Sequence, residues 1–320
     1  MYMAGGTIRH EIARRFHSLS CHQQWNVGIV NDPIHVFLEP DARPRVSWLP
    51  PLGKGSYIAD PFGIERGGEV YVFFEEFSYS SNKGVISWIR ISQDAIPSDG
   101  GVAINMPFHL SHPFLFESEG AVYCVPESFR AKEVGLYRAN HFPNHWQKVG
   151  TLIPNFAGVD PTIFFHQWRW WMMCTDADTG PDDSLFIWYA EEPRGPWRPH
   201  PSNPLIRGRN GTRPAGTPFV RHGDLYRPAM DLTRTYGRRI VLNRVKRLTP
   251  TEFEEEPAGI IEPFPHGHYR DGVHTLSALG NMTLVDGLRV TFERVEFERA
   301  LEAQRLELFG WLSRHLHTSG

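Results

Sequence analysis

A degenerate repeat that occurs five times along the chain is the feature that most constrains its fold. Each copy opens on a short apolar segment next to an aspartate, a histidine or an arginine, and a carboxylate follows about fifteen residues later. Successive copies are 48 to 61 residues apart. The copies open at Asp60, His112, Asp160, Arg213 and His274, and the carboxylates are Glu75 or Glu76, Glu127, Asp176, Asp231 and Asp286.

A period of about fifty residues, carried by strand-like segments, is typical of a β-propeller whose blades are four-stranded antiparallel sheets. Five such blades account for most of the 320 residues, so the sequence predicts an all-β, five-bladed β-propeller over residues 25–293. Hydrophobic residues make up 41% of the chain, and 26 prolines with 29 glycines suit many tight turns. Because blades surround an axis, the five openings should gather their acids and histidines at one end of a central channel.

The two ends of the chain are predicted to be helical. Apolar residues recur at helical spacing within residues 8–19 and again within residues 297–316. Short amphipathic helices are therefore expected in the N-terminal segment, residues 1–24, and in the C-terminal segment, residues 294–320. Such helices would cover apolar surface on the propeller or join two copies of the chain into a homo-oligomer.

The segment that follows the first helix is predicted to be extended. Residues 25–30 and 34–38 are apolar runs on either side of the turn residues Asn31-Asp32-Pro33. One of these runs is expected to pair with the last blade. Such pairing would close the ring and remove its exposed sheet edges.

Charge and cysteine content argue against several classes of protein. The net charge of −3 provides no basic field, so nucleic-acid binding is not expected and a neutral or polar ligand is favoured. The three cysteines are an odd number without metal-type spacing, which argues against a disulfide framework and a zinc site. No apolar run approaches the length of a membrane span and no secretory signal opens the chain. The expected location is therefore cytoplasmic, without a transmembrane segment.

The repeat motifs, taken together, resemble a known propeller domain. They are Ala59-Asp60-Pro61-Phe62, Phe73-Phe74-Glu75-Glu76, Ser111-His112-Pro113-Phe114, Val125-Pro126-Glu127-Ser128, Val159-Asp160-Pro161-Thr162-Ile163, Arg227-Pro228-Ala229-Met230-Asp231 and Gly272-Val273-His274-Thr275. Over about residues 25 to 290 they are similar to the N-terminal domain of plant glucosamine inositolphosphorylceramide transferases and its bacterial relatives. The resemblance implies a carbohydrate or glycolipid partner. In the plant proteins it implies transferase chemistry in a separate C-terminal domain, and no segment of this chain is long enough to be that domain.

The layout is more distantly similar to five-bladed glycoside hydrolases of the fructan- and arabinan-cleaving families. In those enzymes an Asp-Pro pair of the first blade and carboxylates from later blades line one funnel. The resemblance implies that Asp60 is the nucleophile or base and that Asp160 stabilises the transition state. For the general acid, Glu127 is the first candidate and Asp231 the second.

Glycosidic cleavage requires two carboxyl groups in different protonation states, one to attack or activate water and one to protonate the leaving oxygen. A crowded channel can provide this difference, because neighbouring carboxylates raise one another's pKa. The residues predicted to bind substrate are Glu76, His112, Asp176, Arg213 and His274. Sugar faces could stack on exposed rings among Trp168, Trp170, Trp171 and Tyr226.

The same residues also have structural explanations. An acid at the end of a strand often caps the following turn, which is the alternative role of Glu76, Asp176 and Asp286. The aromatic run from Trp168 to Trp171 could pack between blades instead of contacting a ligand.

Three functions therefore stay open. The first is an enzyme, a glycoside hydrolase or a glycosyl-transferring protein, that acts on a bacterial surface glycan or a glycolipid without a cofactor. The second is a non-catalytic carbohydrate-binding propeller that works with a separate glycosyltransferase. The third uses a divalent ion in the channel, for which hard oxygen ligands favour calcium over zinc. Two carboxyl groups around an open pocket would support hydrolysis, whereas carboxylates paired with arginines would support binding.

Overall fold

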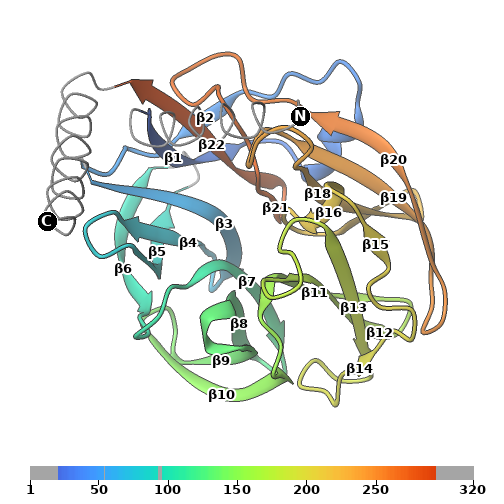
Figure 1. The fold of residues 1–320 in the computed structure, drawn as a ribbon. Helices are drawn as coiled ribbons and strands as arrows, with labels where there is room; N and C mark the ends of the chain where they lie inside the picture. The colour runs from blue at the N-terminus through green and yellow to red at the C-terminus, as the bar shows by residue number, and fades with distance from the viewer. Residues whose placement is uncertain (1–20, 54, 93–95, 293–320) are drawn as a thin grey trace, which may run out of the picture. The chain divides into compact units, whose positions relative to one another are not determined.

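The computed structural model describes residues 21–53, 55–92 and 96–292. Its compact unit Trp25–Leu288 contains five antiparallel sheets around one axis, as in a five-bladed β-propeller (Figure 1). The predicted all-β propeller is confirmed. The helices predicted within residues 8–19 and 294–320, and the oligomer contacts expected of them, lie outside the described residues. No helix in the described ranges is long and apolar enough to span a bilayer.

The first two blades follow the chain from the inside of the ring to the outside. The first blade contains β3 (Ser56–Arg66), β4 (Glu69–Ser78), β5 (Lys83–Ile91) and β6 (Pro97–Ile104). The second blade contains β7 (Ser111–Ser118), β8 (Ala121–Glu127), β9 (Glu133–His141) and β10 (His145–Pro154), with the 3-10 turn η2 (Phe129–Ala131) between β8 and β9.

The third and fourth blades each have one additional short strand. The third blade contains β11 (Gly158–His166), β12 (Arg169–Asp176), β13 (Ser184–Ala190) and β14 (Arg198–Pro199), and β15 (Ile206–Arg207) also pairs with β13. The fourth blade contains β16 (Asn210–Pro214), β18 (Asp224–Asp231), β19 (Ile240–Leu248) and β20 (Phe253–Ile261), and β17 (Phe219–Arg221) also pairs with β18.

The fifth blade is assembled from both halves of the sequence. Its strands are β21 (Leu276–Leu279), β22 (Met282–Phe292), β1 (Cys21–Val30) and β2 (Val46–Trp48), in that order. Because β1 pairs with β22, an N-terminal strand completes the C-terminal blade, as predicted. The prediction of a strand at residues 34–38 is wrong. These residues form the 3-10 helix η1 (Ile34–Leu38), which begins with a hydrogen bond from the Val36 N–H to Pro33 O. The helix buries Ile34 and Phe37 on one face.

The first strand of every blade lies at the axis. These inner strands are β3, β7, β11, β16 and β21, and they surround the centre of the ring in Figure 1. Neighbouring inner strands contact one another along the ring, and a bridge from Gly216 to Leu276 links the fourth blade to the fifth. The repeat openings of the sequence therefore lie on or next to the five strands nearest the axis.

The same backbone irregularity marks the opening of the first three blades. Asp60, His112 and Asp160 have φ angles of 52°, 44° and 50°, and strand pairing skips at each of them. Few residues with a side chain adopt a positive φ, and aspartate and histidine are among those that do so most readily. A β-bulge also redirects a side chain out of the strand's alternation. The repeated bulge therefore explains why this position holds an aspartate or a histidine, and why all three side chains point to one place.

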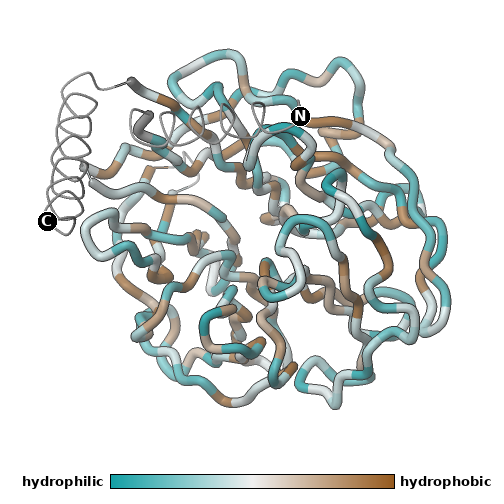
Figure 2. The backbone as a smooth tube through the Cα atoms, in the orientation of Figure 1, coloured by the Kyte–Doolittle hydropathy of each residue, from teal (hydrophilic) through white to brown (hydrophobic). Residues whose placement is uncertain are grey.

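Hydrophobic residues fill the interfaces between neighbouring blades. For example, Phe73 and Trp88 of the first blade pack with Cys124 and Tyr137 of the second. A comparable cluster joins each of the other four pairs of neighbouring blades. In Figure 2 hydrophobic segments follow the strands of every blade.

Substitutions in the aromatic run of the third blade can test this packing between blades. Trp171 is 2% exposed, lies between the third and fourth blades, and donates its indole N–H to His166 O (3.2 Å). We expect Trp171→Ala to lower the free energy of unfolding by about 3–5 kcal/mol, because it leaves a large cavity. Trp168, 91% exposed, is the control, and Trp168→Ala should change that free energy by less than about 0.5 kcal/mol. Equal losses in chemical denaturation would contradict this assignment of the two rings.

Candidate active site

The five repeat openings meet at the axis, where two aspartates lie next to two histidines and an arginine. The His112 N–H donates to Asp60 Oδ2 (3.2 Å), and His112 Nδ1 lies 3.7 Å from Asp160 Oδ1. The Arg213 guanidinium forms an ion pair with Asp160, and His274 Nε2 lies 3.2 Å from Asp60 Oδ1. We call these five residues the axial cluster. Four of them are at most 4% exposed, and the Arg213 side chain is 12% exposed.

Tyr236 lies against the axial cluster and is partly exposed. The Arg213 guanidinium is 5.1 Å from the centre of the Tyr236 ring, and the rings of Tyr236 and His274 are 5.4 Å apart. Trp25 packs on His274 with ring centres 4.1 Å apart. Because 44% of Tyr236 is exposed, a ligand could reach the cluster beside this ring.

Two carboxylates, Asp286 on β22 and Glu127 at the end of β8, hold the bulges of the next blade. Asp286 Oδ2 accepts the Asp60 N–H (3.3 Å) and lies 2.7 Å from His274 Nδ1, while its Oδ1 accepts the His274 N–H (2.9 Å). Glu127 Oε2 accepts the Asp160 N–H (3.0 Å). In both cases the acid lies on the second strand of one blade and its bulge partner lies on the first strand of the following blade. Asp286 and Glu127 therefore fix the backbone that presents Asp60, His274 and Asp160.

The two axial histidines are in opposite electrostatic environments. Burial lowers the pKa of His112, although Asp160 and Asp60 oppose this effect. Burial would also lower the pKa of His274, but the charges of Asp286 and Asp60 outweigh it and raise the pKa. At neutral pH His112 is therefore neutral, whereas the cationic form of His274 is favoured.

Glu127 and Asp160 form a buried pair of carboxyl groups whose pKa values are shifted in opposite directions. Burial raises the pKa of Glu127 well above its ordinary value, and the Asp160 charge raises it further. Burial alone would also raise the pKa of Asp160, but the Arg213 guanidinium outweighs this and lowers it to about 2. The Arg213 guanidinium is closer to Asp160 than to Glu127, whose Oε2 lies 3.7 Å from Arg213 Nη2. The proton of the pair is therefore favoured on Glu127, and the ionised form is favoured for Asp160.

Asp231, the second candidate for the general acid, has a different environment. It accepts the Thr233 N–H (3.0 Å), the Thr233 hydroxyl (2.6 Å) and the Arg239 Nε–H (2.7 Å). Against the effect of burial, these hydrogen bonds lower the pKa of Asp231. An ionised carboxylate cannot donate a proton, so this environment favours Glu127 as the acid.

Two of the acids predicted to bind substrate, Asp176 and Glu76, form hydrogen bonds within their own blades and are not part of the axial cluster. Asp176 accepts the Asp178 N–H (3.1 Å) and the Thr179 hydroxyl (2.9 Å), which caps the turn after β12. Glu76 accepts the Ser87 hydroxyl (2.6 Å) from the neighbouring strand β5. The other three, His112, Arg213 and His274, belong to the axial cluster.

Glu75 is a buried acid that the sequence-based prediction of the site left out. Side chains alternate along β4, so Glu75 and Glu76 point to opposite faces. Glu75 is 5% exposed, and its Oε1 has no hydrogen-bond partner; His109 Nε2 is 3.5 Å away. Burial raises the pKa of Glu75 well above its ordinary value, and the charges of Asp60 and Glu127 add to this.

One regularity of the sequence could have identified Glu75. Asp60 precedes Glu75 by 15 residues, and His112 precedes Glu127 by the same interval. In the structure Glu75 pairs with the residue before Asp60, and Glu127 pairs with the residue before His112. Glu75, rather than Glu76, is therefore the first-blade counterpart of Glu127.

One group of side chains in the described ranges could hold a metal ion: Asp60, His274 and Asp286. Their potential ligand atoms lie within 4.8 Å of one another. Calcium takes about six to eight oxygen ligands. This group offers one imidazole and two carboxylates, and both Asp286 oxygens already accept backbone N–H groups. The residues do not fit a calcium site.

The aromatic residues predicted to stack on sugars lie in other environments. Trp170 packs against Phe116 (5.5 Å between ring centres), and Tyr226 stacks on Phe219 (5.5 Å). Trp171 is buried between blades and Trp168 is exposed at the turn between β11 and β12. The ring in contact with the axial cluster and open to solvent is instead Tyr236.

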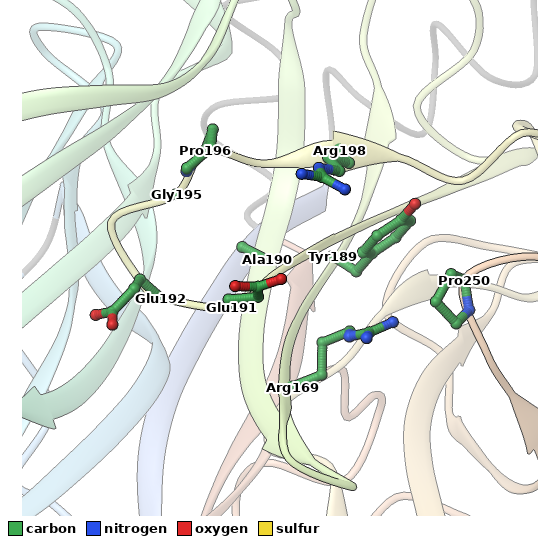
Figure 3. Close-up of a pocket in the computed structure, with 9 residues that line it drawn as sticks. All are labelled: Arg169, Tyr189, Ala190, Glu191, Glu192, Gly195, Pro196, Arg198 and Pro250. Carbon is green, nitrogen blue, oxygen red and sulfur yellow. The ribbon is translucent and has the colours of Figure 1, made fainter.

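A pocket lies on the third blade, next to Pro250 of the fourth. It has a volume of about 360 Å³, and Arg169 and Arg198 lie on either side of Tyr189 in it (Figure 3). The Arg169 guanidinium is 5.4 Å from the centre of the Tyr189 ring. None of the axial residues lines this pocket, so it is separate from the axial cluster.

The fold and the axial cluster define a five-bladed propeller with a buried group of ionisable side chains on its axis. The family model of the N-terminal region of glucosamine inositolphosphorylceramide transferase 1 matches residues 52–264. The chain is 32% identical over 292 residues to the protein of that name from Oryza sativa subsp. japonica, and 35% identical over 253 residues to the one from Arabidopsis thaliana. The chain therefore belongs to this family.

The shared region is only part of the plant proteins. The match to the rice protein covers 85% of this chain and 38% of that protein, and the match to the Arabidopsis protein covers 74% and 33%. The family resemblance stated from the motifs is thereby confirmed.

Solved structures with the same fold include glycoside hydrolases. Zg3597, a family 117 glycoside hydrolase from Zobellia galactanivorans, has a TM-score of 0.53 and 14% identity, over 84% of this chain and 91% of that one. A putative glycoside hydrolase from Bacteroides ovatus ATCC 8483 has a TM-score of 0.54 and 13% identity, over 73% and 86%. At these identities the likeness establishes the fold alone.

Proposed function

We propose that this propeller is carbohydrate-active and that it cleaves or transfers a glycosidic bond at the axial cluster. The observation that carries the proposal is the buried Glu127–Asp160 pair, in which Glu127 Oε2 accepts the Asp160 N–H (3.0 Å) and the Arg213 guanidinium forms an ion pair with Asp160. Burial raises the pKa of Glu127, whereas Arg213 lowers that of Asp160. Pairs of acids with separated pKa values are the usual arrangement for acid–base catalysis. The names of the plant relatives and of the fold neighbours support a glycan or a glycolipid as the substrate.

The proposed roles follow from protonation and hydrogen bonding. Glu127 donates its proton to the leaving oxygen as the bond from that oxygen to the anomeric carbon breaks. Asp60 attacks that carbon or takes the proton of the incoming hydroxyl. Its carboxylate is oriented by the Thr275 hydroxyl (2.9 Å), the His112 N–H (3.2 Å) and His274 Nε2 (3.2 Å). The ion pair of Asp160 with Arg213 keeps the proton on Glu127.

A non-catalytic carbohydrate-binding propeller is the second candidate. It is favoured by the Arg213 guanidinium, which forms an ion pair with Asp160 and also approaches Glu127. Carboxylates neutralised in this way suit binding better than attack. A propeller of this kind would present a glycan to a separate transferase.

A screen that measures turnover and binding separates the two candidates. The purified chain would be incubated with a panel of 4-nitrophenyl glycosides while nitrophenol release is followed, and binding of the corresponding methyl glycosides would be measured by calorimetry. Turnover of at least one member that is lost in Asp60→Asn supports the enzyme. Binding without turnover supports the second candidate, and the absence of both contradicts a carbohydrate function.

A further inference from the structure

The turn between β11 and β12 contains a tryptophan where other blades have a glycine. In the hairpins β3–β4, β7–β8 and β17–β18 the second turn residue is Gly68, Gly120 or Gly223, each with a positive φ. Trp168 occupies the same position in the third blade, with a φ of 62°. Two-residue hairpin turns of this kind favour glycine here, and a positive φ is strained for a bulky side chain. The hairpin itself therefore disfavours a tryptophan at this position.

The Trp168 side chain is also not used in the core of the propeller. It is 91% exposed, although a tryptophan ring is among the side chains that bury the most apolar area when covered. Phe165 and Val220, which lie within three residues of the hairpin turns of the third and fourth blades, are exposed as well. All three are at the ends of their strands that point away from the axial cluster, since β11 carries Asp160 near its start. A strained and exposed aromatic residue in an apolar patch indicates a surface that a partner covers.

The pocket on the third blade lies beside this turn and suits an indole ring. Arg169 directly follows Trp168 in the sequence, and it lies with Arg198 on either side of Tyr189 (Figure 3). Among the described residues, neither guanidinium has a carboxylate oxygen within 4.0 Å. Both cations are therefore available to an aromatic face, and tryptophan is the ring that binds cations best.

Other residues of the pocket complement the remaining parts of an indole. Pro196 and Pro250 offer apolar surface to the ring, and Glu191 offers a carboxylate that can accept the indole N–H. A buried tryptophan usually finds such an acceptor. The volume of about 360 Å³ is within the range of pockets that enclose small ligands. Trp168 does not line the pocket of its own chain, so an indole that fills this pocket must come from elsewhere.

We propose that two copies of this chain associate through the third blade, with the Trp168 ring of each copy in the pocket of the other. Ring and pocket lie next to each other on one surface, so a single twofold axis between them brings both pairs together, which is the commonest symmetry of homodimers. Two tryptophans and four arginines at the centre of the interface are the residue types that dominate binding energy. Because this surface is at the end of β11 away from Asp160, the proposal does not depend on the function of the axial cluster.

Sedimentation equilibrium of the full chain tests the proposal. The wild-type chain should show a reversible equilibrium between monomer and dimer. Trp168→Ala should weaken it by at least about 30-fold and Arg198→Ala by about tenfold, since each removes one side of the contact from both halves of the interface. Arg207→Ala is the control and should change nothing. Arg207 is exposed on β15, which pairs with the start of β13, whereas the pocket is at the end of β13.

A mixture of the two variants provides a sharper test than either variant alone. Each homodimer has two damaged contacts, whereas a heterodimer of Trp168→Ala with Arg198→Ala keeps one Trp168 ring opposite one intact pocket. Chains labelled with donor and acceptor dyes should therefore associate more tightly with the other variant than with themselves. A general loss of stability in either variant cannot produce this preference.

Three results would overturn the proposal. They are a wild-type chain that stays monomeric at submillimolar concentration, a Trp168→Ala variant that associates as well as the wild type, and a mixture without preference for the heterodimer. If the chain is monomeric and Trp168→Ala abolishes binding to phosphatidylcholine vesicles or to a panel of glycans, Trp168 serves that partner and the dimer is wrong.

Discussion

Replacing Asp60 by Asn should lower the turnover of any glycoside that the wild-type chain cleaves by about three to five orders of magnitude. Asparagine keeps the volume of the side chain but removes the charge needed to attack the sugar or to activate water. It also cannot accept all of the hydrogen bonds that Asp60 accepts, so the free energy of unfolding should fall by about 1–3 kcal/mol. Initial rates and denaturation curves of the same preparations measure both effects.

Asp99→Asn is the control for this substitution, because Asp99 is exposed on β6 of the same blade. It should leave both rate and stability near the wild-type values. A folded Asp60→Asn variant that retains more than a tenth of the wild-type rate would remove Asp60 from the reaction. If that variant changes only the affinity for sugar, the binding function is favoured.

Replacing Glu127 by Gln should produce a loss that depends on the leaving group. Glutamine can still accept the Asp160 N–H, but it has no proton to donate. Turnover of a glycoside with a poor leaving group should fall by about two to four orders of magnitude, whereas a 4-nitrophenyl glycoside should be affected little, since nitrophenolate departs without protonation. The ratio of the two rates, in the wild-type chain and in the variant, is the measurement.

The pH dependence gives a second test of Glu127. Its pKa is raised by burial and by Asp160, so the acid keeps its proton to a higher pH than an ordinary glutamate and loses it as the pH rises through that raised value. The wild-type rate should therefore fall on the alkaline side, and Glu127→Gln acting on a nitrophenyl glycoside should lack this fall. If Asp231→Asn shows the leaving-group pattern instead, the role of the acid belongs to Asp231.

The architecture could be predicted because its period is present in the sequence. Asp60, His112 and Asp160 each stand at a bulge next to an apolar strand, and a recurring Asp-Pro or His-Pro pair is visible without coordinates. Closure by an N-terminal strand could be predicted as well, since it removes exposed edges. The 3-10 helix at Ile34–Leu38 was missed because an apolar run of five residues suits a strand or a helical turn equally well.

The details of the site depend on contacts that the sequence does not display. Glu75 and Glu76 are adjacent, and a shift of one residue along a strand moves a side chain to the opposite face. The state of Glu127 depends on Arg213, which arrives from two blades further along the chain and forms its ion pair with Asp160. Asp231 differs from Glu127 through Arg239, eight residues away in the same blade. The interval of 15 residues that Asp60–Glu75 shares with His112–Glu127 does point to Glu75, but the contacts of Arg213 and Arg239 do not follow from residue type or spacing.

The closure of the ring has a consequence for how the protein acquires its chemistry during folding. The hydrogen bond from the Asp60 N–H to Asp286 joins residues 226 positions apart, and the one from Thr275 to Asp60 joins residues 215 positions apart. Contacts across such separations form late, since the intervening chain must first be ordered. The axial site is therefore completed only when the last blade docks on the first, so that partly folded chains can contain several finished blades and yet lack a finished site.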